Sequence, residues 1–143
     1  MAIPIPTQRR RLAPARLALH AEALASILVA SLAIRLLPFP RIVGLGARPK
    51  RPRATGAGVA ALRGPVRGWA RRVPWRALCF ETALALRMML ARRGTASTLH
   101  YGIAREEGLK AHVWLSVDGE VVIGADGAAG YSEVATFPPD PPR

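Results

Sequence analysis

Apolar and small residues dominate one long stretch near the beginning of the chain. Residues 12–37 are rich in Ala and Leu, both strong helix formers, and stop at the Pro-Phe-Pro of residues 38–40. We predict one long helix here. Its uncharged run, residues 23–34, is shorter than the roughly 20 apolar residues that a spanning helix needs. The helix is therefore expected to pack in the core or to lie against a partner or a membrane surface, and a transmembrane span is the weaker alternative.

The following stretch lacks a continuous apolar period. Residues 44–58 combine Gly, Pro and like charges, which is typical of a connector. Residues 59–72 predict short helical pieces, because Gly64, Pro65 and Gly68 interrupt the pattern.

In the last part of the chain, apolar and polar positions follow more regular patterns. Residues 76–93 carry an apolar stripe at helical spacing, and Gly94 is a natural cap after a basic last turn. Residues 96–105 predict a strand, residues 106–110 a turn, and residues 111–126 a β-hairpin. A helix followed by three antiparallel strands predicts an α+β fold, with the helix packed on a small antiparallel sheet.

Length and composition set the domain organisation and the compartment. The chain has 143 residues, of which 50% are hydrophobic, so its composition is that of a folded protein. We divide it into an N-terminal helical region with a basic linker, residues 1–58, and a core, residues 59–143. The single Cys cannot form an internal disulfide and no convincing signal peptide follows Met1, so the cytoplasm is the expected location.

The formal net charge of +12 is large for this length. Most of it lies in three basic clusters: residues 9–11, 48–53 and 63–76. No zinc-finger spacing or aromatic RNA-binding signature accompanies them, so we expect a solvated basic surface and no nucleic-acid partner.

Cys79 is placed where the helix of residues 76–93 begins, shortly after Pro74. Unpaired N–H groups and the helix dipole favour a thiolate at such a position, as a nucleophile requires. The alternative is a small buried thiol without chemistry, which the same position also suits.

A nucleophilic Cys needs a His to hold its proton, and the chain has three. His20 is expected on the polar side of the first helix, and His100 in a strand with a structural or exposed role. His112 opens the predicted hairpin and is the best candidate for the base.

Asp118 and Asp126 both follow His112, and the predicted pairing of the hairpin distinguishes between them. With a three-residue loop at residues 118–120, three apolar pairs share one face: Val117–Val121, Leu115–Ile123 and Val113–Ala125. The same register sets His112 opposite Asp126, within reach of its ring. Asp118 lies about 20 Å along the strand and is expected to form the turn. The alternative for Asp126 is a turn role before Gly127.

These residues coincide with a known family pattern. The segments that carry it are CFETALALRMMLARRGTASTLHYGIAR, AHVWLSVDGEVVIGAD and YSEVATF, with AEALASILVASLAIRLLPFPRIVGLG upstream. Together they resemble the transglutaminase-like cysteine peptidases of lasso-peptide biosynthesis, the B-type leader peptidases. The sequence departs from the usual pattern in Cys-Phe for Cys-Leu and in His-Val-Trp for His-Ala-Trp.

The resemblance implies a transglutaminase-like or papain-like core with a Cys79–His112–Asp126 catalytic triad and no cofactor or metal. It implies removal of the leader from a precursor peptide and delivery of the core peptide to an asparagine-synthetase-like macrocyclase. No small β-rich module precedes residue 12, which implies a separate leader-recognition protein as partner. The first helix is then expected to dock on a partner or contact a membrane peripherally.

Trp114 shares the strand face of His112 and is expected to contact substrate or to shield the dyad, with simple packing as the alternative. Trp69 and Trp75 are expected to be structural. Two other functions stay open: an acyltransferase that uses the same triad with an amine acceptor, and a non-catalytic basic scaffold that binds peptide.

Overall fold

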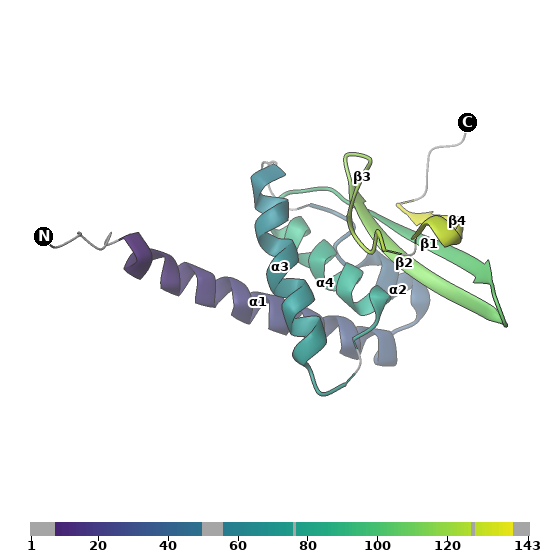
Figure 1. Ribbon diagram of the computed structural model, residues 1–143, viewed down its shortest axis with the longest axis horizontal. Coiled ribbons are helices and arrows are strands. Elements are labelled where there is room, and N and C mark those ends of the chain that lie inside the picture. Colours follow the sequence, from purple (N-terminus) through teal and green to yellow (C-terminus); the bar gives the residue numbers. More distant parts are fainter. Residues whose placement is uncertain (1–7, 50–55, 76, 127, 139–143) are drawn as a thin grey trace, which may run out of the picture.

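A computed structural model describes residues 8–49, 56–75, 77–126 and 128–138, and the fold within these ranges is α+β as expected (Figure 1). The elements, in chain order, are α1 (Gln8–Leu36), α2 (Phe39–Gly44), α3 (Gly56–Arg72), α4 (Cys79–Arg92), β1 (Thr98–Arg105), β2 (Leu109–Val117), β3 (Glu120–Ile123), the 3-10 turn η1 (Ala128–Gly130) and β4 (Ser132–Phe137).

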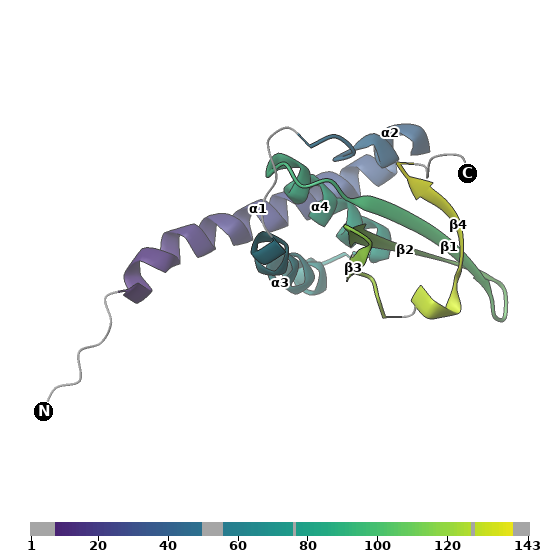
Figure 2. The same ribbon diagram turned by 90° about the horizontal axis from the view of Figure 1, so that it is seen from above.

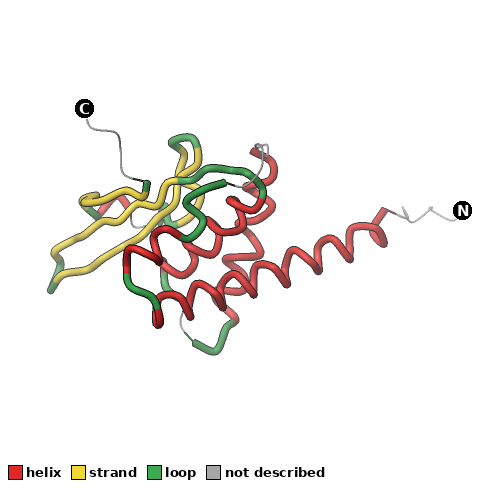
Figure 3. Tube along the Cα trace, turned by 180° about the vertical axis from the view of Figure 1, so that it is seen from behind, coloured by secondary structure: helices red, strands yellow, loops and turns green. Residues whose placement is uncertain are grey.

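The helices gather on one side of a four-stranded antiparallel sheet of order β3-β2-β1-β4 (Figure 2). α4 packs on β2, and α1 and α3 pack on α4 and on each other. The start of α1 and the sheet lie at opposite ends of the molecule, because the first turns of α1 extend beyond the body (Figure 3). α4 is the central helix, because α1, α3 and β2 all pack on it.

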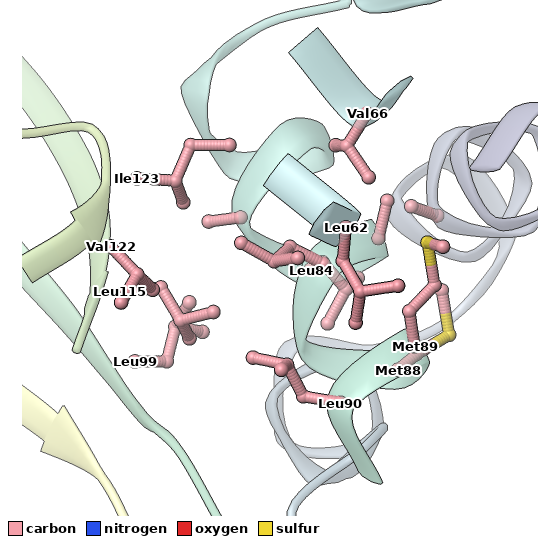
Figure 4. Packing of buried hydrophobic residues seen from close by; sticks show 14 of the residues in the cluster. Leu62, Val66, Leu84, Met88, Met89, Leu90, Leu99, Leu115, Val122 and Ile123 are labelled. Atoms are coloured by element: carbon pink, nitrogen blue, oxygen red, sulfur yellow. The ribbon is translucent and has the colours of Figure 1, made fainter. Parts of the chain in front are cut away.

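The core lies between α4 and the sheet and continues to α1 and α3 (Figure 4). The sheet contributes Leu99, Leu115 and Ile123, all at most 4% exposed. α4 is buried around most of its surface, and eight of its apolar residues belong to the core or its border: Ala83, Leu84, Ala85, Leu86, Met88, Met89, Leu90 and Ala91. Such all-round burial explains why an Ala- and Leu-rich sequence without a strong amphipathic pattern forms this helix.

The predicted long N-terminal helix is confirmed as α1. Ala23, Ile27 and Ala30 are fully buried at spacings of four and three, so one face packs against α3 and α4. The opposite face leaves large apolar residues exposed: Leu17, Leu28, Val29, Leu32 and Leu36. By length and composition, the stretch Pro14–Leu36 could span a membrane, but 33% of its apolar window is buried within this fold.

The prediction of interrupted helical pieces over residues 59–72 is wrong. α3 is one helix with Pro65 inside it. Val59, Leu62 and Val66 are all at most 8% exposed and follow helical spacing. Burial of this apolar stripe against α1 and α4 outweighs the lost backbone hydrogen bond at Pro65. Of the predicted connector, residues 50–55 lie outside the described residues.

Polar contacts fasten α1 to its neighbours. Trp69 Nε1 donates to His20 Nδ1 at 3.1 Å, and Trp75 Nε1 donates to Ser31 Oγ at 2.9 Å. The two tryptophans therefore have the structural role expected of them. His20 was expected on the polar side of the helix, but it is half-buried and accepts an indole proton instead.

The side chain of Arg87 lies entirely inside the part of the protein that the structure describes. Arg87 is 0% exposed and donates to the carbonyl oxygens of Val43 at 2.5 Å and Phe137 at 2.7 Å. Desolvation lowers the pKa of Arg87 to about 10. The guanidinium joins α2 and β4 to α4, and it satisfies two carbonyl groups that the ends of those elements would otherwise leave buried.

Candidate active site

Cys79 is the first residue of α4 and is half-buried. The helix begins here because Leu78 is extended, with φ −84° and ψ 176°, and because the first helical hydrogen bond runs from Thr82 N to Leu78 O. Glu81 Oε2 accepts the Leu78 N–H at 2.6 Å. The N–H groups of Cys79 and Phe80 have no intrahelical partner in this first turn, so they are available to an anion at the thiol.

Cys79 lines a cavity of about 280 Å³ between α3, the start of α4 and the end of β3. The other residues of its wall are Arg67, Ala70, Arg71, Ala77, Thr82, Ile123, Gly124 and Asp126. The thiol predicted as nucleophile and the carboxylate predicted as orienting acid thus share one cavity. Residues of three separate elements meet there.

His112 lies on β2 and is half-buried; it does not line this cavity, and its contact with the wall is the backbone of Gly124. Its Nε2 lies 2.8 Å from the carbonyl oxygen of Gly124. A carbonyl oxygen only accepts, so Nε2 carries the proton and donates it, and in the neutral ring Nδ1 is left as the acceptor. A backbone carbonyl therefore holds the tautomer that leaves Nδ1 able to take a proton.

The predicted hairpin register is right at one pair and wrong around it. Leu115 pairs with Ile123 as expected, but Val117 pairs with Glu120 across a two-residue turn instead of a three-residue loop. In this turn Asp118 has φ 51° and Gly119 has φ 82°, a conformation that Asp-Gly favours. An irregularity next to Leu115 restores the pair with Ile123, but Val121 pairs with Ser116 and is exposed, so its predicted place on the apolar face is wrong.

The strand pairing does not extend to the acid. β3 ends at Ile123, so the expected pairs of Val113 with Ala125 and of His112 with Asp126 are not formed. Gly124, with φ 83°, turns the chain away from β2. Asp126 is exposed at the cavity wall, and no hydrogen bond joins it to His112 among the described residues. Asp118 lies at the hairpin tip, as expected.

The open face of the sheet carries a row of stacked rings. Trp114 lies between His100 and His112, with ring centroids 5.4 Å and 5.9 Å away, and Tyr131 lies 5.1 Å from His112. Trp114 is only 7% exposed. It passes so close to Gly102 that a Cβ there would lie 2.7 Å from the indole. Packing against Trp114 and Tyr131 thus fixes the position of the His112 ring. The expected contact of Trp114 with substrate stays a prediction.

His100 has partners that sequence reasoning missed. Its Nδ1 lies 2.8 Å from Glu133 Oε2 and its Nε2 lies 2.7 Å from Ser116 Oγ. Glu133 belongs to β4, a strand that the pattern did not predict, so no sequence signal connected the two residues. The Glu133 contact fixes one side of the row in which Trp114 and His112 stack.

The arginines of the cavity were also missed as site residues. Arg67 and Arg71 lie four residues apart on α3, a spacing that places both on one face of a helix. That spacing is visible in the sequence, but only a continuous helix through Pro65 brings Arg63 into the same row. The contact between α3 and the start of α4 depends on tertiary packing.

The sequence matches the transglutaminase-like superfamily over residues 24–136, most of the chain, and the protein belongs to that superfamily. Its members are generally cysteine peptidases or acyltransferases. No curated protein and no solved structure matches the chain.

Proposed function

We propose that this protein is a cytoplasmic cysteine peptidase that removes the leader from a ribosomally made lasso-peptide precursor. The observation that carries the proposal is the cavity at the start of α4. It contains the only thiol of the chain, the carboxylate of Asp126, and Gly124, whose carbonyl holds His112. Membership of the transglutaminase-like superfamily supports an acyl-transfer reaction at this thiol.

In the proposed reaction the Cys79 thiolate attacks the carbonyl carbon of the bond between leader and core. The oxyanion that forms is stabilised by the free N–H groups at the start of α4. His112 takes the thiol proton at Nδ1 and returns it to the departing amine of the core peptide. Water then attacks the thioester, which releases the leader as an acid and restores the thiol.

Two contacts have to form when the peptide binds. His112 must reach Cys79 through Nδ1, and Asp126 must turn from solvent towards the imidazole. Catalytic hydrogen bonds often tighten only in the complex with substrate, so the proposal requires these two contacts when the peptide is bound. Until Asp126 moves, the Gly124 carbonyl orients the ring.

The proposed partners are the precursor peptide, a separate leader-recognition protein that presents it, and an asparagine-synthetase-like macrocyclase that takes the freed core peptide. Their support is the family resemblance of the sequence. A short precursor gene and genes for these two proteins beside this one would agree with it.

The test is incubation of the purified protein with the precursor encoded beside it and the leader-recognition protein, followed by mass spectrometry. We expect two fragments, and no cleavage with Cys79→Ala. Asp126→Asn should lower the rate at least about 100-fold, as loss of acid–base assistance does. Asp118→Asn is the matched control, because it removes the same charge from a turn position that Asn tolerates.

The outcomes separate the alternatives. A product in which an amine has been joined to the peptide would identify an acyltransferase. Full in-cell function with Cys79→Ala would identify a binding scaffold. Equal rates for Asp126→Asn and Asp118→Asn would contradict the role of Asp126.

A further inference from the structure

The cavity at Cys79 has more positive charge than peptide cleavage requires. Arg67 and Arg71 both line it, against one carboxylate, that of Asp126. Among the described residues, no ion pair includes either arginine. The carbonyl of a peptide bond is neutral, and the start of α4 already offers N–H groups to the oxyanion. The two guanidiniums therefore need another explanation.

A neighbouring cavity along the same helix has a different balance of charge. It has a volume of about 290 Å³ and lies between the earlier turns of α3 and the β2–β3 hairpin. Its arginine, Arg63, is accompanied by Asp118 and Glu120. Arg63 also donates to the carbonyl oxygen of Val122 across the α3–β3 seam, at 3.4 Å. That cavity has two carboxylates for one arginine, whereas the cavity beside the thiol has two arginines for one carboxylate.

The geometry of the two arginines suits a carboxylate. They are four residues apart on one helix, so they project from the same face, and Arg67 is half-buried whereas Arg71 is exposed. A guanidinium binds a carboxylate through two parallel N–H groups, and partial burial strengthens such a pair. Arginine is also weakly hydrated, which lowers the cost of the contact.

We propose that Arg67 and Arg71 bind an acidic side chain of the substrate peptide, within a few residues of the bond that Cys79 attacks. The site then selects peptides by an Asp or Glu near the cleavage point. This inference rests on the proposed function, because it requires a peptide in this cavity. Cleavage requires the thiol of Cys79, whereas this binding of an acidic side chain requires only the two arginines of α3.

The experiment measures binding without chemistry. The full chain with Cys79→Ala is titrated into short rhodamine-labelled peptides that differ only at the centre, which is Glu-Glu, Gln-Gln or Lys-Lys, and anisotropy is recorded. We expect the Glu-Glu peptide to bind about tenfold more tightly than the Gln-Gln peptide, as close charge pairs at an interface do. The use of Cys79→Ala excludes an effect of the arginines on the thiolate.

Charge reversal tests the assignment of the residues. R67E/R71E should abolish the preference for Glu-Glu and should favour the Lys-Lys peptide. R16E/R35E is the matched control: it changes the net charge by the same amount at exposed positions of α1, and should keep the preference. If R67E/R71E fails to fold by circular dichroism, R67Q/R71Q replaces it and should also abolish the preference.

Two results would overturn the inference. One is a Glu-Glu preference that survives in R67E/R71E or R67Q/R71Q, and the other is a preference that R16E/R35E weakens equally, which would indicate attraction to the overall charge of +12. The failures are distinguishable. Cleavage without the arginine-dependent preference removes this inference alone, whereas the preference without cleavage of the precursor removes the proposed function.

Discussion

Gly124 links the catalytic histidine candidate to the cavity through its backbone alone. Its φ of 83° is a conformation that side chains rarely adopt, and a Cβ there would lie 2.9 Å from both Trp114 Cβ and Val113 O. The position therefore demands glycine twice, for the backbone conformation and for the close approach to β2. In this conformation the carbonyl oxygen of Gly124 accepts the hydrogen bond from Nε2 of His112.

We predict that Gly124→Ala lowers the rate of precursor cleavage at least about tenfold, because the displaced carbonyl no longer orients the imidazole. Gly119→Ala is the control. Gly119 has a similar φ of 82°, but nothing lies within 4 Å of its added Cβ. Backbone strain should cost both variants about 1–2 kcal/mol of unfolding free energy, and Gly124→Ala should lose more because its added Cβ also meets β2. Kinetic assays and urea denaturation check this, and an equal loss of rate in both would disprove the orienting role of Gly124.

At the scale of elements, the two ends of α4 have different roles. Its start presents Cys79, and its last turn is held by α1, where Glu22 pairs with Arg92 at 3.0 Å and with Arg93 at 2.5 Å. The hydrogen bond from Arg93 holds the pKa of Glu22 below its ordinary value of 4.5, although partial burial opposes this, and the same bond raises the pKa of Arg93. The pair joins α1 to the helix that carries the thiol.

A carboxyl whose pKa is lowered by folding stabilises the protein when it is ionised. We predict that the stabilisation from Glu22 is fully present above pH 4.5 and is lost as the pH falls through its folded pKa. Urea denaturation of the protein and of Glu22→Gln should therefore differ near neutral pH and converge in acid. In an Arg93→Gln background the difference near neutral pH should shrink. A difference that persists in acid would contradict the ionic origin.

At the scale of the whole molecule, α1 is part of the core. Ala23, Ile27, Ala30 and Ala33 are at most 7% exposed and complete the packing of α3 and α4. The superfamily match begins at residue 24, inside this helix. The boundary at residue 58 between a helical region and a core stays a prediction, but the apolar core crosses it.

We predict that deletion of residues 1–40 unfolds the protein, because it removes this buried face of α1. Leu28→Ser/Leu32→Ser, two changes on the exposed face, should leave the fold intact. Circular dichroism and thermal unfolding distinguish the two. A folded protein after the deletion would contradict a core role for α1. The surface variant then tests the expected docking role, since only it can weaken association with a partner without unfolding the chain.

The sequence pattern by itself determined those features that depend on neighbours along the chain. These are the long first helix, the helix with Cys79 in its first turn, and strands β1 and β2. Each follows from local propensity, capping or alternation, which act over a few residues. The α+β class and the place of the thiol in its helix were predictable for that reason.

Only the tertiary structure decided which distant groups meet. Burial of an apolar stripe kept α3 helical through Pro65 and so brought Arg67 and Arg71 to Cys79. The end of β3 at Ile123 gave His112 a backbone carbonyl as partner and left Asp126 at the cavity wall. β4, which carries the partner of His100, was missed. Such contacts join residues far apart in the chain, and they depend on packing and on one irregularity in a strand, which local patterns do not encode.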